Sequence, residues 1–339
     1  MSVTKIFIQM KNLKYIFMLF AVALLVSCEK EDLTVEIDSV SKYGSEFFQG
    51  QKVQVWVSAN VSDLANTTYK WECSGGTFSG PTNLFQNVWV APREQGEFLV
   101  TCTVESGGKS DKRSTKMVVG PYFFDKFSFP STNFTLSNFT ATYTNGEVLL
   151  VGSRANTRGS FRRAFGDTAL YNPFTYKADM AWRDKYKNAT SSMFYRLQFD
   201  KPRRKDGTKV KQYVREIRLE MWPTATGTAM NYSLRFEVFN SEFSMATWTI
   251  MEQGRKPEFV FTDGAKAPDK KGMRPITIAV GANFQTTVTL DGVPVIQSDA
   301  IGAWRTANNI PDKLNLGRLW VEVFEQSNFY MDNIVLELQ

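Results

Sequence analysis

Charged and aromatic residues alternate with apolar residues along four segments in the C-terminal part of the sequence, 193–199, 213–222, 232–239 and 319–325. Guanidinium and carboxylate groups form paired hydrogen bonds with polar ligands, and aromatic rings stack on flat apolar surfaces. This combination suits a sugar-binding groove, and the alternative is an ordinary solvated sheet face with scattered aromatics. The face in question carries Arg196, Gln198, Glu216, Arg218, Glu220, Trp222, Arg235, Glu237, Trp320, Glu322 and Phe324.

Trp222 and Trp320 are the candidate stacking platforms of this groove. The candidate hydrogen-bonding groups are those of Arg196, Arg218, Arg235, Glu220 and Glu322. Because strand side chains alternate between faces, the intervening apolar residues should form the core. These core candidates are Tyr195, Leu197, Phe199, Ile217, Leu219, Met221, Leu234, Phe236, Val238, Val321 and Val323.

The connection between the first two segments can be checked by register. A strict two-residue turn at Asp206-Gly207 would pair Tyr195 with Arg218 and so place a core residue opposite a groove residue. A one-residue slip inverts every side chain, so we predict an odd-length loop or a bulge here. The connecting stretch 201–211 holds six basic residues and one acid. It is either a contact for acidic glycans or a soluble hairpin tip.

Catalysis has a restricted set of groups available, because the chain contains no histidine. Histidine is the usual general base near neutral pH and the commonest metal ligand, so Ser-His-Asp, Cys-His and His-bound zinc chemistry are excluded. The candidate acid and base residues are Glu216 and Glu220, two carboxylates on one strand face. Four residues of strand separate their backbones by about 13 Å. That is long for two carboxylates that flank one glycosidic bond.

The rest of the C-terminal region indicates a β-sandwich of about a dozen strands. Asp291-Gly292 stands between the alternating segments 287–290 and 293–296, and this dipeptide favours a two-residue hairpin turn. Together with the closing segment 329–336, this hairpin resembles the concanavalin-like lectin/glucanase jelly roll. The resemblance implies that segment 124–127 pairs with the closing strand. Asp125 and Asp332 are candidates for a structural calcium site, and no other cofactor is required.

Enzymes of this fold carry catalytic signatures that are degraded here. Glucanases show Glu-x-Asp-x-x-Glu, but Arg218 stands where the central acid belongs. The stretch Glu216-Ile217-Arg218 resembles part of an alginate-lyase motif, but Val214 replaces its first arginine and the motif that needs histidine is absent. The comparison favours a binding protein over a glycoside hydrolase or polysaccharide lyase. A structural or adhesive surface protein is the third alternative.

Residues 33–119 form a separate candidate domain. The stretch from Tyr69 to Phe78, then Val88 to Pro92 and Gly96 to Val104, resembles the PKD and immunoglobulin-like repeats of bacterial surface proteins. The resemblance implies a β-sandwich that serves as a spacer, with a glycan or protein site as the alternative. Cys73 and Cys102 either pair as a disulfide or remain buried thiols. The expected architecture is all-β: an immunoglobulin-like sandwich followed, at 121–339, by the larger jelly roll.

The N-terminus has the layout of a signal peptide. Lys11 and Lys14 precede the twelve-residue apolar run Tyr15 to Val26, which is shorter than the roughly 20 residues a spanning helix needs. Leu24-Leu25-Val26-Ser27-Cys28 resembles a bacterial lipoprotein signal. This implies cleavage after residue 27 and lipidation of Cys28. Residues 28–32 would then form the tether, and Lys30-Glu31-Asp32 resembles the lipoprotein export signal of Bacteroidota.

These features predict a lipid-anchored protein on the outer membrane that faces the cell exterior. Removing residues 1–27 leaves 312 residues and, with three lysines gone, lowers the formal net charge from +6 to +3. So small a charge does not indicate nucleic-acid binding. The expected partner is a polysaccharide or oligosaccharide, with other glycan-uptake proteins of the cell surface as further candidates.

Overall fold

The computed structural model describes residues 33–127, 130–144, 147–152, 158–166, 170–182, 192–202, 210–224, 229–257, 273–310, 313–324 and 328–339. The predicted signal segment, Cys28 and the export signal lie outside the described residues, as does 203–209 of the basic stretch. Within the described ranges, no helix is both long and apolar enough to cross a membrane. The chain divides into two compact units, one of Met1–Tyr43, Lys52–Trp89 and Phe98–Lys116, the other of Gly44–Gln51, Val90–Glu97 and Met117–Gln339.

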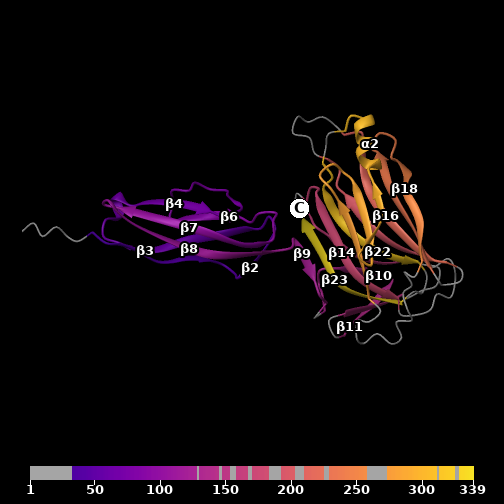
Figure 1. Cartoon of the computed structure of the whole chain (residues 1–339), viewed down its shortest axis with the longest axis horizontal. Helices are drawn as coiled ribbons and strands as arrows, with labels where there is room; N and C mark the ends of the chain where they lie inside the picture. The colour runs from indigo at the N-terminus through magenta and orange to yellow at the C-terminus, as the bar shows by residue number, and fades with distance from the viewer. Residues whose placement is uncertain are drawn as a thin grey trace, which may run out of the picture. The chain divides into compact units, whose positions relative to one another are not determined.

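The N-terminal region forms a sandwich of two four-stranded sheets (Figure 1). One sheet has the order β1 (Val35–Lys42), β3 (Lys52–Val61), β6 (Gln86–Val90), β5 (Thr77–Phe78). The other has the order β2 (Glu46–Phe48), β8 (Lys109–Gly120), β7 (Gly96–Ser106), β4 (Thr68–Cys73). A 3₁₀ turn, η1 (Leu64–Asn66), begins at Asp63, whose carboxylate accepts a hydrogen bond from the backbone N–H of Asn66.

Two tryptophans anchor the core of this sandwich. Trp71 and Trp89 are buried, and each indole N–H still donates a hydrogen bond, to Leu84 O at 2.7 Å and to Gly75 O at 2.9 Å. A buried indole needs such a partner, because an unpaired donor costs free energy. The alternating valines of β3 supply much of the remaining apolar surface.

Cys73 and Cys102 lie on the neighbouring strands β4 and β7, where Trp71 pairs with Cys102 and Cys73 with Val100. Both thiols are free. Burial raises the pKa of Cys73, and it raises the pKa of Cys102 to about 12. Cys102 packs in the core as a small apolar side chain, whereas Cys73 is half-buried, and whether the two form a bridge is a prediction for thiol counting.

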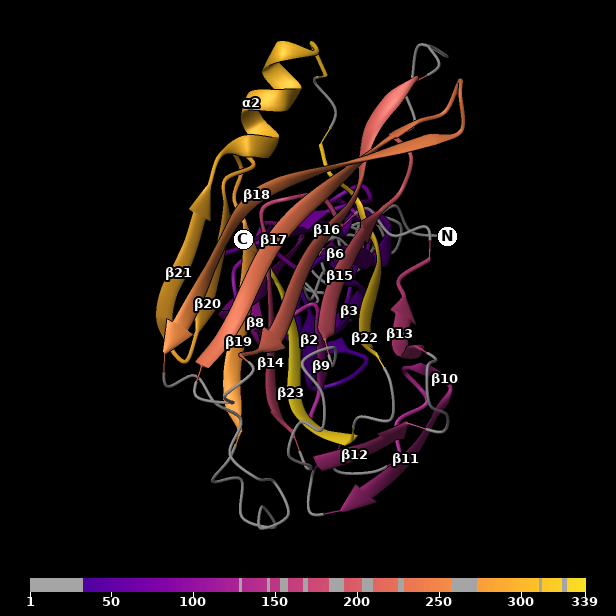
Figure 2. The same cartoon turned by 90° about the vertical axis from the view of Figure 1, so that its right-hand side faces the viewer.

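The C-terminal region is a larger sandwich of mainly antiparallel sheets. The seven-stranded sheet has the order β10 (Thr135–Ser137), β13 (Arg158–Ala164), β22 (Leu316–Phe324), β15 (Met193–Phe199), β16 (Gln212–Pro223), β17 (Ala229–Asn240), β18 (Met245–Pro257). Figure 2 shows β18, β17, β16, β15, β22 and β13 side by side in this sequence. The four strands β15 to β18 are consecutive in the chain and are neighbours in the sheet, whereas β22, β13 and β10 come from distant segments, so only part of the order could be read from adjacent segments.

The second sheet of this sandwich has eight strands. Its order is β11 (Phe139–Thr144), β12 (Glu147–Gly152), β23 (Asn328–Leu338), β14 (Phe174–Trp182), β19 (Arg274–Val280), β20 (Thr286–Leu290), β21 (Val293–Ser298), with β9 (Phe123–Asp125) paired to β23. The pairing of β9 with the closing strand confirms the expectation for segment 124–127. A helix, α2 (Ala300–Ala307), follows β21. Together the two sandwiches confirm the all-β fold.

Both register predictions are confirmed. Tyr195 pairs with Leu219, so core residues face core residues across β15 and β16. In the other hairpin, Leu290 pairs with Val293, and Asp291 and Gly292 have φ angles of 56° and 76°. Positive φ at both central residues is what a type I′ turn requires.

Candidate functional site

The predicted groove residues share the face of the seven-stranded sheet that points away from the core. Tyr195, Leu197, Ile217 and Leu219 are fully buried between the two sheets. Their alternates on the same strands therefore project from the opposite side, as the period of two requires. We call this the outer face. Among the residues described below, its members are Arg158, Arg162, Phe194, Arg196, Gln198, Arg215, Glu216, Arg218, Glu220, Trp222, Arg235, Glu237, Phe239, Trp248, Ile250, Trp320 and Glu322.

The register arranges these side chains in rows that run across the strands. Arg162 pairs with Trp320, Trp320 with Arg196, Arg196 with Arg218, and Arg218 with Arg235. We call Arg162, Arg196, Arg218 and Arg235 the arginine row. Adjacent rows carry acids: Glu322 and Glu220 lie to one side, and Glu216 and Glu237 to the other. The row crosses five strands. The alternation of residues within each strand predicts which face a side chain is on, but not which residues of neighbouring strands lie opposite one another.

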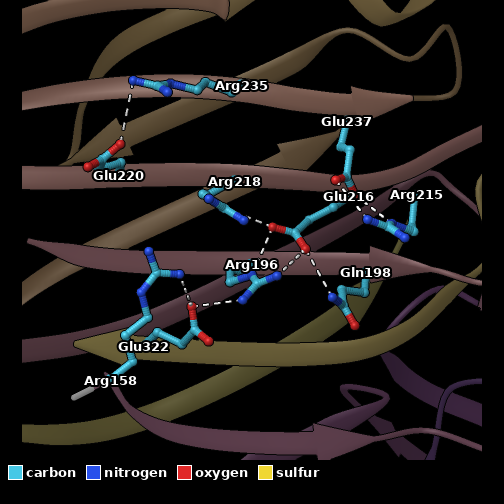
Figure 3. Close-up of polar contacts among 10 residues, drawn as sticks. All are labelled: Arg158, Arg196, Gln198, Arg215, Glu216, Arg218, Glu220, Arg235, Glu237 and Glu322. Carbon is cyan, nitrogen blue, oxygen red and sulfur yellow. Dashed lines mark hydrogen bonds and ion pairs between the residues drawn. The ribbon is translucent and has the colours of Figure 1, made fainter. Parts of the chain in front are cut away.

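Glu216 is the centre of the polar network on this face (Figure 3). Arg196 donates to its two carboxylate oxygens from Nε at 2.8 Å and Nη2 at 2.7 Å. Gln198 Nε2 donates at 2.9 Å and Arg218 Nε at 3.0 Å. Burial by itself raises the pKa of Glu216, but the hydrogen bonds and charge of Arg196, followed by Gln198 and Arg218, outweigh it and lower the pKa below its ordinary value. Glu216 is therefore an ionised, fully engaged carboxylate.

A second buried acid holds Arg196 from the other side. Arg196 Nη1 donates to Glu322 Oε2 at 2.8 Å, and Arg158 Nη1 lies 3.9 Å from the same oxygen. Burial tends to lower the pKa of Arg196, but its bonds and charge interactions with Glu216 and Glu322 raise it. Every nitrogen of the Arg196 guanidinium is thus bonded to a protein carboxylate, which fixes its position.

Aromatic rings flank the guanidinium groups. The Arg196 guanidinium carbon lies 4.5 Å from the centroid of Trp320, and that of Arg162 lies 6.0 Å from the same ring. Arg218 lies between two rings, 4.1 Å from Trp248 and 5.5 Å from Phe194. Such distances fall within the range of cation–π attraction. Trp320, predicted as a stacking platform, is therefore already in contact with arginine.

Two further ion pairs complete the face. Arg235 Nη2 lies 3.6 Å from Glu220 Oε2. Arg215 binds Glu237 through Nε at 2.5 Å and Nη2 at 2.8 Å, and its guanidinium carbon lies 4.5 Å from the Phe239 ring. A bulge between Val214 and Glu216 turns Arg215 to the outer face, which strict alternation would have placed in the core.

Trp222 lies apart from this network. It is half-buried near the end of β16 and pairs with Asn231. Since it is four residues from Arg218 along one strand, their backbones are about 13 Å apart. The structure thus brings Arg196, Arg218, Glu216, Glu322 and Trp320 together, with Glu220 and Arg235 beside them, and leaves Trp222 at the margin.

Several residues of the face escaped the sequence prediction. Arg162 and Arg158 lie on β13, a strand with few apolar residues, and Trp248 lies on the edge strand β18, which is mostly exposed. Neither strand has a clear apolar alternation. Two features of the sequence could have indicated these residues. Three arginines, Arg158, Arg162 and Arg163, lie close together, and Trp248 lies in a segment rich in residues that favour strands.

The carboxylates do not have the surroundings of a catalytic acid and nucleophile. The side chain of Glu216 is 1% exposed, and its oxygens accept bonds from Arg196, Gln198 and Arg218. An ionised carboxylate with saturated oxygens has no proton to donate and no free lone pair directed at a substrate. Glu220, 22% exposed at the side chain, faces Arg235.

The two calcium candidates lie on the other sheet. Asp125 accepts hydrogen bonds from the Phe127 backbone at 2.9 Å, from Asn133 Nδ2 at 3.1 Å and from Ser131 Oγ. Asp332 is buried. In the described part of the chain, no three acidic, cysteine or histidine residues gather as a metal-binding group. Protein donors thus already bond to the oxygens of Asp125. Calcium binding at Asp125 and Asp332 stays a prediction, and it is tested by measuring whether a chelator lowers the melting temperature.

A cavity of about 590 Å³ lies elsewhere on the second unit, beside α2. Its lining includes Phe284, Asp299, Arg305 and Asn309. None of the outer-face residues lines it. The charged rows and this cavity are therefore separate features.

The fold and the outer face define an all-β protein made of a small sandwich and a larger jelly-roll-like sandwich with a charged, aromatic sheet face. Residues 39–119 match the PKD domain, which confirms the expected N-terminal domain. No curated protein sequence matches the chain.

Solved structures with carbohydrate-related names are similar to it. The κ-carrageenase of Pseudoalteromonas carrageenovora, in complex with an oligotetrasaccharide of κ-carrageenan, has 12% identity and a TM-score of 0.41, covering 63% of this chain and 93% of that one. The β-agarase B of Zobellia galactanivorans has 11% identity and a TM-score of 0.41, covering 63% and 90%. The Emp47p carbohydrate recognition domain has 14% identity and a TM-score of 0.38, covering 63% and 93%. Identities and TM-scores this low do not transfer a substrate to this chain.

Proposed function

We propose that the second sandwich binds a polysaccharide across the outer face. The observation that carries the proposal is the arginine row, which has Trp320 between Arg162 and Arg196 and is held in place by the buried carboxylates of Glu216 and Glu322. Guanidinium groups and aromatic rings together recognise sugar hydroxyls and sugar faces. Because Arg196 is fixed by the protein itself, the face is arranged before a ligand arrives, which lowers the entropic cost of binding.

The state of the carboxylates supports a binding protein in preference to an enzyme. Both candidates for acid and base work, Glu216 and Glu220, take part in ion pairs on the sheet. Their spacing along β16 is also long for a hydrolytic pair. The residues proposed from the sequence as glycan contacts are Arg196, Arg218, Glu220, Trp222, Arg235, Trp320 and Glu322. Within this set, Arg196 and Glu322 bond to each other and are proposed to position the face, and Trp222 lies at its margin.

The proposed setting is the outer surface of the outer membrane. Residues 1–27 would be removed as a signal peptide, Cys28 would carry the lipid, and the PKD domain would act as a spacer. Support comes from the short apolar run and the sequence around Cys28. Replacing Cys28 with Ala should release the protein from the membrane fraction. External protease should digest the wild-type protein in intact cells, whereas protection from protease would contradict surface exposure.

A glycan array with the full chain, followed by product analysis on the strongest hit, tests the binding function. Retention of one or more polysaccharides without new reducing or unsaturated ends is the expected result. New ends would instead show a hydrolase or lyase. If no glycan is retained and the protein captures a purified surface protein, it has an adhesive role and the proposal is wrong.

A further inference from the structure

We infer that the polysaccharide is anionic, and that its carboxylate or sulfate groups bind along the arginine row. This inference rests on the proposed function and adds the chemical class of the ligand. Arg196, Arg218 and Arg235 lie directly opposite one another on three adjacent strands, and Arg162 continues the row beyond Trp320. This arrangement is unusual, because like charges directly opposite one another destabilise a sheet. A sheet face that served only solubility would have no need of this arrangement.

The dimensions of the row suit an extended polymer. Arg162 lies on β13 and Arg235 on β17, with β22, β15 and β16 between them. Four strand spacings of about 4.8 Å give a row of roughly 19 Å. The row runs across the strands, so the bound chain would also run across them.

The charges of the central face do not cancel. Its arginines are Arg158, Arg162, Arg196, Arg218 and Arg235, and its acids are Glu216, Glu220 and Glu322. Five positive and three negative groups leave an excess of two positive charges. The nearby pair of Arg215 and Glu237 neutralises itself and does not change this balance.

The excess is located on particular guanidinium groups. Arg196 uses all three nitrogens on Glu216 and Glu322 and so has a positioning role. Arg218 uses Nε on Glu216, and among the described residues its two Nη atoms have no hydrogen-bond partner. Arg162 is exposed and forms no ion pair within the described ranges.

Arg235 is also partly available to a ligand. Its side chain is 37% exposed, its Nε donates to Ser233 Oγ at 3.1 Å, and its Nη2 lies 3.6 Å from the carboxylate of Glu220, a long and weak pair. Arg162 therefore presents its guanidinium to a ligand, and Arg218, whose side chain is 17% exposed, and Arg235 offer their Nη groups beside it. This geometry matches the two oxygens of a carboxylate or a sulfate better than it matches a single hydroxyl.

The test uses pairs of polymers that differ only in charge. The full chain is titrated by calorimetry with polygalacturonate and its carboxyl-reduced form, and with a sulfated galactan and its desulfated form. Where an anionic polymer binds, we expect its affinity to be at least about tenfold higher than that of its neutral counterpart. Added salt should weaken the binding. The two anionic arms show whether carboxylate or sulfate is preferred.

Three variants link the effect to the row. Arg162→Gln and Arg235→Gln should each weaken anion binding several-fold, whereas Glu220→Gln, which removes a competing acid, should strengthen it. Lys177→Gln is the charge-matched control, because Lys177 lies on β14 in the other sheet and pairs with Glu337. Arg162 is exposed, so its replacement should leave folding intact.

The outcomes separate the two levels of the proposal. Equal affinity for charged and neutral forms would overturn the anionic class and leave polysaccharide binding standing. A charge preference that Arg162→Gln and Arg235→Gln do not change would overturn the role of the row. If none of these polymers binds and the array also shows no retention, the proposed function fails together with the inference.

Discussion

Arg196 on β15 forms two hydrogen bonds with Glu216 on β16, at 2.8 and 2.7 Å, across adjacent strands of the outer face. The pair lies diagonally, because Arg196 itself faces Arg218 in the register. Their side chains are 12% and 1% exposed. The contact fixes the middle of the arginine row and makes Glu216 a structural residue of the site.

Removing one partner of this pair should destabilise the second sandwich. Glu216→Leu leaves the cations of Arg196 and Arg218 without their common acceptor, and breaking a buried ion pair costs about 3–5 kcal/mol. Urea unfolding followed by tryptophan fluorescence measures the loss. Glu72→Gln is the control, because that carboxylate pairs with Lys70 and Lys112 on an exposed surface. A loss no larger than that of the control would show that the buried pair is not maintained in solution.

The stability of the second sandwich should depend on pH through Glu216. Its folded pKa lies below the unfolded value of about 4.3, so its contribution is complete above that pH and disappears as pH falls through the folded pKa. The difference in unfolding free energy between wild type and Glu216→Gln should therefore shrink as the solution is acidified from pH 6 toward about pH 3. Urea titrations across this range test the sign, and a difference that grows on acidification would contradict it.

The two cysteines of the PKD domain should behave as free thiols that are shielded in the folded state. Burial raises the pKa of Cys102 to about 12, so little thiolate is present at neutral pH. The protein should be lipidated, so that Cys28 carries no free thiol. A thiol reagent should then modify Cys102 slowly in the folded protein, and it should modify both Cys73 and Cys102 in urea. Mass spectrometry of the urea-treated sample gives the count. A protein that yields no reactive thiol until a reductant is added has a disulfide instead.

Much of the fold could be predicted from alternation. Segments 193–199 and 216–222 have a period of two, and their inward and outward residues lie where this pattern placed them, whereas the bulge between Val214 and Glu216 interrupts the pattern at the start of β16. Asp291-Gly292 specified its hairpin because few residues other than glycine, asparagine and aspartate adopt positive φ readily. Such local rules act over a few residues, and the sequence displays them directly.

The rows of the site could not be predicted, because they depend on which strands are neighbours. Arg162 meets Trp320 only because β13 pairs with β22, a strand more than 150 residues later. The edge strand β18 has no clear apolar alternation, because most of its side chains are exposed and few of them, such as Met251, pack against the core. Helix α2 has only eight residues, which is too few for a helical repeat of apolar residues to stand out in the sequence.

The most direct test of the central claim is the location of the bound polymer. Hydrogen–deuterium exchange of the full chain, with and without the polysaccharide that binds most tightly, maps the amides that become protected. Binding across the outer face predicts protection in β13, β15, β16, β17 and β22, and unchanged exchange in β19, β20 and the PKD domain. Protection confined to the cavity beside α2 or to the PKD domain, with β16 and β22 unaffected, would contradict the account.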